Sequence, residues 1–172
     1  DWPPRSQAPQ ARTVTNSGSA QFQAITATDA QALAVLEGSC VFSDDFVREE
    51  SLAAWTAGRA FICAALRGDG TILDYGCANG YLLRCLQEWS GLVLEPYGID
   101  VDADRLRQAR EMLPDHAHHF AEPEEAATSG DFPTGFDHVY WAVGDNVDFD
   151  HVEHRRWLAK VQAHTGARGR LI

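Results

Sequence analysis

Acidic and glycine residues between positions 71 and 100 are spaced in a way that suits binding of a small charged ligand. Asp74 ends a short apolar segment, Gly76 and Gly80 follow it, and Asp100 stands 20 residues beyond Gly80. Glycine lets a ligand approach the main chain without meeting a Cβ atom, and N–H groups at the start of a helix favour negative charge. The pattern therefore predicts a cofactor loop, although a glycine pair also occurs in ordinary tight turns.

The segments on either side of this loop differ in hydrophobic period. Residues 71–73 are short, apolar and partly β-branched, which is typical of a buried strand. After Gly80, apolar residues recur at spacings of three to four, which predicts an amphipathic helix; they are Leu82, Leu83, Leu86 and Trp89. A strand, a glycine loop and a helix therefore follow one another directly.

Counting positions in the loop separates two kinds of nucleotide site. A dinucleotide fingerprint starting at Gly76 needs glycines at positions 78 and 81, which hold Ala78 and Tyr81. The pattern that fits is acid-x-Gly-x-small-x-Gly, filled by Asp74, Gly76, Ala78 and Gly80. In this register the chain resembles the class I S-adenosylmethionine-dependent methyltransferases. Ala78 replaces the commoner middle glycine, and we expect it to cost little space.

The resemblance implies S-adenosyl-L-methionine as the cofactor and assigns a role to each part of the site. Asp74 and the loop would hold its methionine end, with loop amides near the carboxylate and an acid near the ammonium. Asp100 would bind the ribose, and Asp102 would cap the following helix, although either acid can serve as that cap. The other implied contacts are Cys77, Asn79, Val101, Ala121, Glu122 and Trp141.

The order of elements predicts an α/β fold, a Rossmann-like, doubly wound and mainly parallel sheet of the methyltransferase type with N-terminal helices. Strands are expected near residues 71–75, 92–99, 117–121, 136–142 and 169–172, and helices near 80–90, 102–113 and 151–165. Residues 122–130 are expected to form a weak helix or a loop. The family's fold usually continues with another helix and two strands, so we expect the C-terminal strands to be missing.

We divide the chain into a flexible arm at 1–27, a helical cap at 28–70 and the cofactor-binding core at 71–172. Within the cap, Trp55 and Arg59 are one turn apart and are predicted either to cover the site as a lid or to be an ordinary packed and solvated pair. Both alternatives remain open from the sequence.

The net charge and the spacing of the cysteines limit which partners and which cellular compartment we expect. The net charge is −11 with no basic stripe, which disfavours nucleic acid as a partner. No apolar run is long enough to span a membrane. The four cysteines lack metal-ligand spacing and suggest reduced thiols in the cytoplasm. We therefore expect a small-molecule methyl acceptor with a hydroxyl, amine or carbon nucleophile.

The candidates for catalysis lie near the fourth strand. Tyr140, Trp141 and Ala142 are expected to line the pocket for the donated methyl group, although Tyr140 and Trp141 can also be ordinary strand packing. His151 is a candidate general base within an acidic and histidine-rich segment, which can equally be the solvated start of a helix. We expect no metal site there, nor at His116, His118 and His119, which are expected to lie at the surface.

Two other functions stay open. One is a methyltransferase-like module without catalysis that acts through a partner. The other, less favoured, is an NAD(P)-dependent oxidoreductase, whose fold shares the same alternation of strands and helices.

Overall fold

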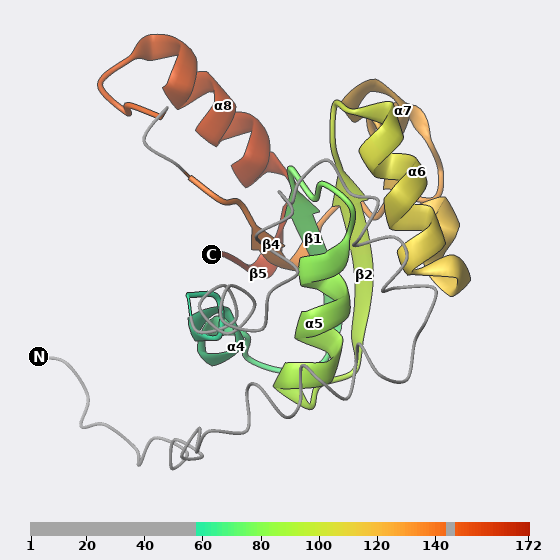
Figure 1. Cartoon of the computed structure of the whole chain (residues 1–172). Helices are drawn as coiled ribbons and strands as arrows, with labels where there is room; N and C mark the ends of the chain where they lie inside the picture. The colour runs from blue at the N-terminus through green and yellow to red at the C-terminus, as the bar shows by residue number, and fades with distance from the viewer. Residues whose placement is uncertain (1–57, 144–146) are drawn as a thin grey trace, which may run out of the picture.

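The computed structural model describes residues 58–143 and 147–172 and shows a five-stranded sheet (Figure 1). All pairings within it are parallel, and the strand order is β3-β2-β1-β4-β5. The strands are β1 (Gly70–Tyr75), β2 (Leu94–Ile99), β3 (Phe120–Ala121), β4 (Phe136–Tyr140) and β5 (Thr165–Leu171).

Helices connect these strands and cover both faces of the sheet. They are α4 (Phe61–Ala65), α5 (Tyr81–Ser90), α6 (Ala103–Met112), the 3-10 helix η1 (Pro114–His119), α7 (Pro123–Thr128) and α8 (Val152–Ala163). Buried side chains of α4, α5 and α6 form one core cluster, and those of α7 and α8 join a second cluster on the opposite face. The fold is therefore a doubly wound α/β sheet, as the alternation of elements predicts.

The position of β1 decides where a ligand can bind. The chain builds outward from β1 through β2 to β3 and then returns to place β4 on the other side of β1. In such sheets the crevice at the carboxyl ends of the strands, where the strand order reverses, is the usual ligand site. The glycine loop after β1 lies at this switch point.

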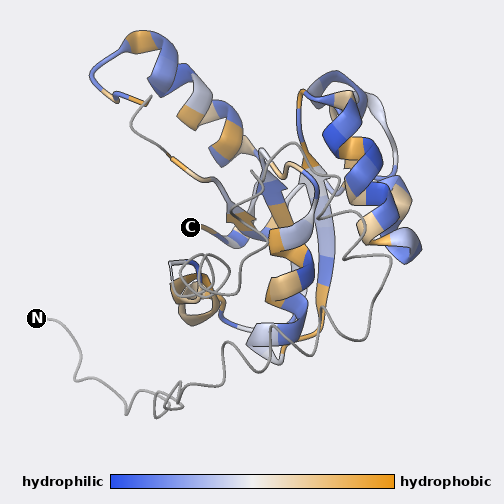
Figure 2. Ribbon diagram, viewed as in Figure 1, coloured by the Kyte–Doolittle hydropathy of each residue, from blue (hydrophilic) through white to orange (hydrophobic). Residues whose placement is uncertain are grey.

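The local sequence explains the central unit. Ile72 and Leu73 are fully buried, as expected for an inner strand covered on both faces. Helix α5 buries one apolar side, which appears in Figure 2 as an orange stripe along the helix. Leu83 and Leu86 on that side are fully buried, so packing against the sheet stabilises the helix that follows the loop.

The third strand is shorter than the predicted 117–121. Residues 117–119 belong to η1, which begins at Pro114, where the proline ring favours a helical first turn. His119 is buried rather than at the surface, because its Nδ1 lies 3.1 Å from the carbonyl oxygen of Pro96 and its ring stacks on Tyr97 at 3.9 Å. His118 is exposed, as expected.

Other predicted boundaries shift by a few residues. The predicted helix at 151–165 ends at Ala163, so β5 begins at Thr165 instead of residue 169. The segment at 122–130 contains the short helix α7, which again starts with a proline. Strand β4 ends at Tyr140, two residues before the predicted end at 142.

The predicted arm at 1–27 and most of the helical cap, including Trp55, lie outside the described residues. Of the cap, the structure describes residues 58–70. Helix α4 buries Ile62 completely against the core that contains α5. Among the described residues, no helix is long and apolar enough to cross a membrane.

Close packing at Gly98 generates a stability prediction. A Cβ atom there would lie 2.6 Å from Cys77 Sγ and 2.6 Å from Phe120 Cδ1, both from neighbouring segments of the fold. We expect Gly98→Ala to lower the free energy of unfolding by about 1–3 kcal/mol, because buried overpacking forces its neighbours apart. Gly130→Ala is the matched control, since a Cβ there meets no atom within 4 Å. Equal denaturation midpoints for the two variants would contradict this account.

Candidate active site

The loop after β1 turns through residues with left-handed backbone angles. Gly76 has φ of 89°, and Gly80 has φ of 73° just before α5. The N–H groups of Gly76 and Cys77 both donate to the carbonyl oxygen of Ile99, at 2.7 Å and 3.0 Å. These bonds fix the loop to the end of β2. A Cβ on Gly76 would meet no atom within 4 Å, so open space lies beside this glycine.

Ala78 departs from the expected pattern in its backbone conformation, not in the space it needs. Its φ of 49° makes it the sole non-glycine residue with positive φ in the described chain. A Cβ in the left-handed region costs roughly 1–2 kcal/mol. The expectation that alanine is a mild substitution for the middle glycine is therefore incomplete, because it considered side-chain volume alone.

Most amides of the loop already donate hydrogen bonds within the chain. Besides Gly76 and Cys77, Ala78 N–H donates to Asp100 Oδ2 at 2.8 Å, and Gly80 N–H donates to the carbonyl oxygen of Cys77 at 2.9 Å. These four amides therefore shape the loop before any ligand arrives. This sharpens the sequence-based expectation, in which loop amides bind a ligand carboxylate.

The side chains of Cys77 and Asn79 point into the protein. Both are almost completely buried, and Asn79 Oδ1 accepts a hydrogen bond from Tyr81 N–H at 3.3 Å. Burial raises the pKa of the Cys77 thiol well above its ordinary value, and the nearby carboxylates Asp74 and Asp100 add to this effect. The two side chains thus support the loop and the start of α5.

Asp74 is a buried carboxyl at the carboxyl end of β1. It is 4% exposed, and no donor in the described part of the chain hydrogen-bonds to it. The pKa of Asp74 is raised to about 7, mainly by burial and also by the charge of Asp100, while the charge of Arg59 partly opposes the rise. A cationic group placed beside Asp74 would therefore be strongly favoured, since it would stabilise the ionised form.

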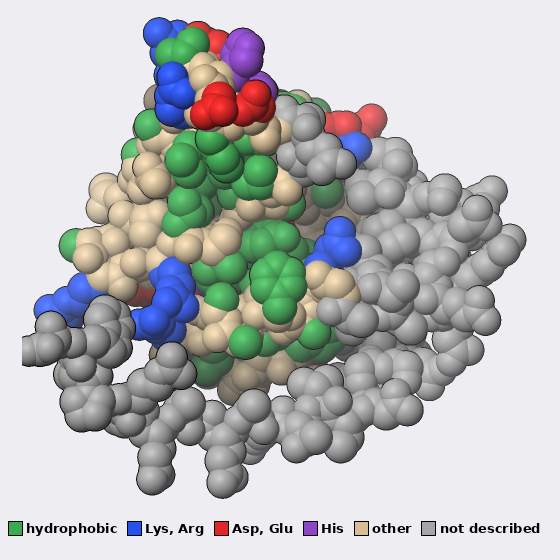
Figure 3. Space-filling model, turned by 90° about the vertical axis from the view of Figure 1, so that its left-hand side faces the viewer, with side chains coloured by type: hydrophobic (Ala, Val, Ile, Leu, Met, Phe, Trp, Pro, Cys, Tyr) green, Lys and Arg blue, Asp and Glu red, His purple; other side chains and the backbone are tan. Residues whose placement is uncertain are grey.

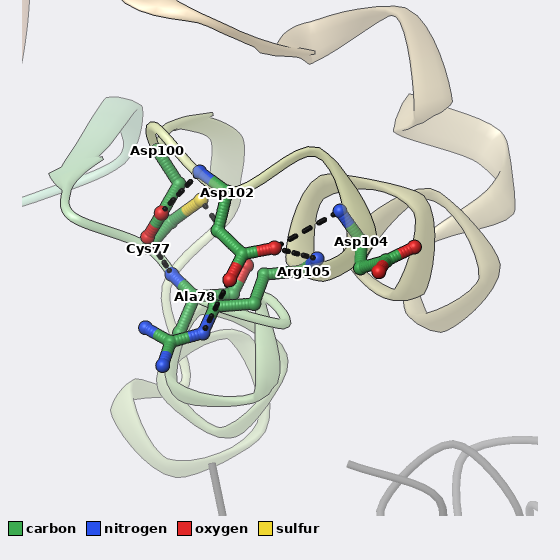
Figure 4. Close-up of polar contacts among 6 residues, drawn as sticks. All are labelled: Cys77, Ala78, Asp100, Asp102, Asp104 and Arg105. Atoms are coloured by element: carbon green, nitrogen blue, oxygen red, sulfur yellow. Dashed lines mark hydrogen bonds and ion pairs between the residues drawn. The ribbon is translucent and has the colours of Figure 1, made fainter. Parts of the chain in front are cut away.

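Asp100 joins the loop to the end of β2 (Figure 4). Its Oδ2 accepts from Ala78 N–H, and its Oδ1 accepts from Asp102 N–H at 3.0 Å. A carboxylate has about four acceptor positions, so each oxygen can still accept another hydrogen bond. The side chain is 7% exposed at the ligand edge.

Asp102 is the cap of α6, as predicted. Its Oδ1 accepts from the N–H groups of Asp104 and Arg105, at 3.0 Å and 3.1 Å (Figure 4). Asp100 is therefore not needed as the cap. Asp102 caps the helix, and Asp100 does not, because Asp102 lies directly before the first helical turn.

Three further predicted contacts lie at the ends of β2 and β3. Val101 is 82% exposed, an unusual state for a valine beside a sheet edge. Ala121 is buried, and its carbonyl oxygen accepts from Asp100 N–H at 3.4 Å, which holds the two strand ends together. Glu122 follows β3 and is exposed just before α7.

A pocket of about 610 Å³ opens beside the end of β4. It is lined by Gly58, Arg59, Phe61, Tyr140, Trp141, Ala142, Val143 and Ile172. Tyr140 and Trp141 were predicted to line such a pocket, whereas Phe61 and Ile172 were not. Ile172 could have been found from topology, because parallel neighbouring strands end at the same edge; Trp141 N–H donates to its carbonyl oxygen at 3.2 Å.

Tyr140 lies within electrostatic range of Asp74 and Arg59. Burial raises the pKa of Tyr140, Asp74 raises it further, and Arg59 lowers it. The phenol is consequently protonated at neutral pH and can donate a hydrogen bond. Its pKa shift does not suit it to act as a base.

The structure does not bring His151 into this pocket. His151 is exposed at the start of α8, its N–H donates to the carbonyl oxygen of Asp148 at 3.0 Å, and its ring lies 5.3 Å from that of His154. Helix α8 extends away from the glycine loop in Figure 1. Within residues 58–143 and 147–172, no three His, Cys, Asp or Glu side chains are grouped so that they could hold a metal ion.

No protein-family model and no curated protein matches the sequence significantly. Solved structures do resemble the fold. The PH0226 protein from Pyrococcus horikoshii OT3 has a TM-score of 0.55 and 20% identity, covering 74% of this chain and 58% of its own. The [4+2]-cyclase SpnF has a TM-score of 0.53 and 17% identity, covering 89% and 58%.

A glycopeptide N-methyltransferase, MtfA, has a TM-score of 0.50 and 19% identity, covering 67% of this chain and 50% of its own. The chain spans less than two thirds of the length of each of these three proteins. At such identities the likeness shows the fold alone. The chain therefore has the Rossmann-like fold of the methyltransferase type.

The strained residue of the loop gives one prediction. Ala78→Gly should raise the free energy of unfolding by up to about 1 kcal/mol, because glycine adopts positive φ without the penalty of a Cβ. Chemical denaturation measures this change. Ala109→Gly, at a buried helical position, is the control and should destabilise. A loss of stability in Ala78→Gly would show that Ala78 is not strained.

Asp74 gives a pH-dependent prediction. Its pKa in the folded chain, about 7, exceeds its usual value, 3.8, so the folded state holds this proton more tightly. The associated stability, roughly 4 kcal/mol, is complete below pH 3.8 and is lost as the pH rises through 7. Between pH 5.5 and 8, the free energy of unfolding should therefore fall by about 2 kcal/mol less in Asp74→Asn than in the wild type.

Urea denaturation at both pH values measures this difference. Asp115→Asn, which changes an exposed carboxyl, is the control and should retain the wild-type pH dependence. Parallel pH profiles for Asp74→Asn and the wild type would show that Asp74 does not titrate in this range.

Proposed function

We propose that the chain binds S-adenosyl-L-methionine at the carboxyl edge of the sheet and transfers its methyl group to a small-molecule acceptor. The observation that carries the proposal is a pair of buried acids at the ends of two neighbouring strands, near enough for the charge of Asp100 to raise the pKa of Asp74. Asp74 lacks a hydrogen-bond donor in the described chain, and Asp100 retains acceptor capacity on the adjacent strand end. A Cβ atom on Gly76, in the loop between these acids, would meet no atom within 4 Å.

The residues present fit this cofactor part by part. Asp74 would hold its ammonium, and this contact would relieve the cost of the buried negative charge. Asp100 would accept hydrogen bonds from the ribose hydroxyls. The exposed side chain of Val101 would pack on the adenine, with Ala121 and Glu122 beside it.

The bound cofactor supplies a methyl group on a sulfonium, which is already an excellent leaving group. The work left to the protein is mainly positioning. Tyr140 can donate a hydrogen bond to the acceptor and orient it, since its phenol stays protonated. Trp141 and its neighbours provide an apolar wall against which an acceptor can pack.

The fold alone does not decide between methyl transfer and other chemistry. SpnF, which resembles this fold, is described as a [4+2]-cyclase. A module without catalysis would also retain the same sheet and loop. The proposal therefore requires an assay of methyl transfer itself, and binding of the cofactor would not be sufficient.

The cytoplasm remains the compartment that we propose for this activity. The support is chemical: the three cysteines in the described residues, Cys63, Cys77 and Cys85, are free thiols. Reduced cysteines are usual in the cytosol.

Asp100 offers a test of the cofactor assignment. Asp100→Ala should weaken binding of S-adenosyl-L-homocysteine by roughly 10- to 150-fold, equivalent to about 1.5–3 kcal/mol for a hydrogen bond to a charged group. Isothermal titration calorimetry measures this change. Asp104→Ala removes an exposed acid nearby and is the control, for which we expect less than a twofold change.

Asp100 also binds Ala78 N–H, so the loop effect must be separated from the ribose effect. The 2′-deoxy analogue of S-adenosyl-L-homocysteine makes this separation. If Asp100 contacts the ribose, the penalty of Asp100→Ala should be smaller for the analogue. An equal penalty for both ligands would assign the whole effect to the loop.

Methyl transfer is tested with the full-length protein, S-adenosyl-L-methionine labelled on its methyl group and an extract of the source cells. We expect the label to appear in a small molecule, and we expect Asp100→Ala to reduce the yield at limiting cofactor. Binding of the cofactor without any labelled product would favour the non-catalytic alternative. Binding of NAD(P) in its place would favour the oxidoreductase.

A further inference from the structure

The pocket beside β4 has a lining of unusual composition. Three of its residues are aromatic, namely Phe61, Tyr140 and Trp141, and Val143 and Ile172 add aliphatic surface. Phe61 is 60% exposed and Val143 is 46% exposed, so much of this apolar surface is open to solvent. Pockets of this size and character usually bind small molecules with extended apolar surfaces.

Among the described residues that line the pocket, Arg59 is the one with a charged side chain. It lines the pocket together with Tyr140, and its charge lowers the pKa of Tyr140 and that of Asp74. The guanidinium therefore acts between the proposed cofactor edge and the pocket. A cation at this place contrasts with the chain as a whole, which carries a net charge of −11.

The space-filling view in Figure 3 agrees with an apolar pocket lining that includes an arginine. Figure 3 views the side of the molecule that carries α4 and the end of β5, and hydrophobic side chains gather there with Lys and Arg side chains at their margins. At the upper end of this face in Figure 3, acidic side chains lie together with Lys, Arg and His side chains.

We infer that the pocket binds a flat, apolar acceptor bearing one anionic group, and that Arg59 binds this group. This inference rests on the proposed function, because it names the acceptor class for the same site. Aromatic walls favour a flat ring system by stacking. The planar guanidinium matches a carboxylate through two parallel hydrogen bonds, which a neutral or cationic group cannot accept.

A cationic acceptor is the main alternative for an aromatic pocket, since Tyr140 and Trp141 can bind cations on their ring faces. Arg59 opposes that alternative, because two like charges in one pocket repel each other. The charge of the preferred ligand therefore distinguishes the two possibilities directly.

The test uses three matched probes with the full-length protein: 2-naphthoate, the neutral naphthalene-2-carboxamide and the cationic 2-naphthylmethylamine. Binding is measured by calorimetry with and without saturating S-adenosyl-L-homocysteine. We expect 2-naphthoate to bind at least about tenfold more tightly than the carboxamide, as one charge-assisted hydrogen-bonded pair provides. Equal affinities, or a preference for the amine, would overturn the inference.

Variants of Arg59 test whether this residue causes the preference for the anionic probe. Arg59→Gln should reduce the ratio of the two affinities to about twofold or less, whereas Arg59→Lys should retain part of it because the charge remains. Arg67→Gln, outside the pocket lining, should leave the ratio as in the wild type. A ratio is compared within each variant, so a loss of folded protein does not imitate the effect. A preference that survives in Arg59→Gln would assign the anion to another residue.

The binding measurements with S-adenosyl-L-homocysteine and with the naphthalene probes also test this inference separately from the proposed function. Failure of S-adenosyl-L-homocysteine to bind would overturn the cofactor assignment, while the naphthoate ratio would still report on Arg59. A tight cofactor complex with no anion preference would overturn the acceptor class alone.

Discussion

The hydrogen bonds accepted by Asp100 hold together the parts of the structure on which the site depends. One oxygen binds the glycine loop after β1, and the other binds the residue that caps α6. Two strand ends, a loop and a helix start are thus fixed by a single carboxylate. The same side chain must remain partly accessible to serve a ligand, so organisation of the loop and recognition of a ligand are coupled at one residue.

The two buried acids impose an electrostatic constraint on this arrangement. Asp74 and Asp100 lie close enough for their charges to repel, and burial makes that repulsion stronger than it would be in water. Functional sites often retain such unfavourable features because a ligand of opposite charge relieves them. Repulsion between the two acids lowers the free energy of unfolding of the ligand-free chain. A cationic ligand beside them would restore part of that free energy.

The sequence predicted the elements whose signal is local. Alternating strands and helices gave the doubly wound sheet, and the position of Asp102 before a helix gave the cap. Hydrophobic period could not reveal that His119 packs on Tyr97, because that contact joins residues 22 positions apart. Likewise, glycine spacing identified the loop, but the positive φ of Ala78 depends on bonds to Ile99 and Asp100 that only the folded chain shows.

The pocket was predicted only in part for the same reason. Its walls come from three distant segments: the ends of β4 and β5 have a recognisable position in the strand order, whereas the segment at Phe61 has none. The burial of Cys77 has a consequence of a different kind. A thiol enclosed within the glycine loop, with a raised pKa, is a poor nucleophile, so electrophilic reagents that modify cysteine would leave this loop intact in the folded protein.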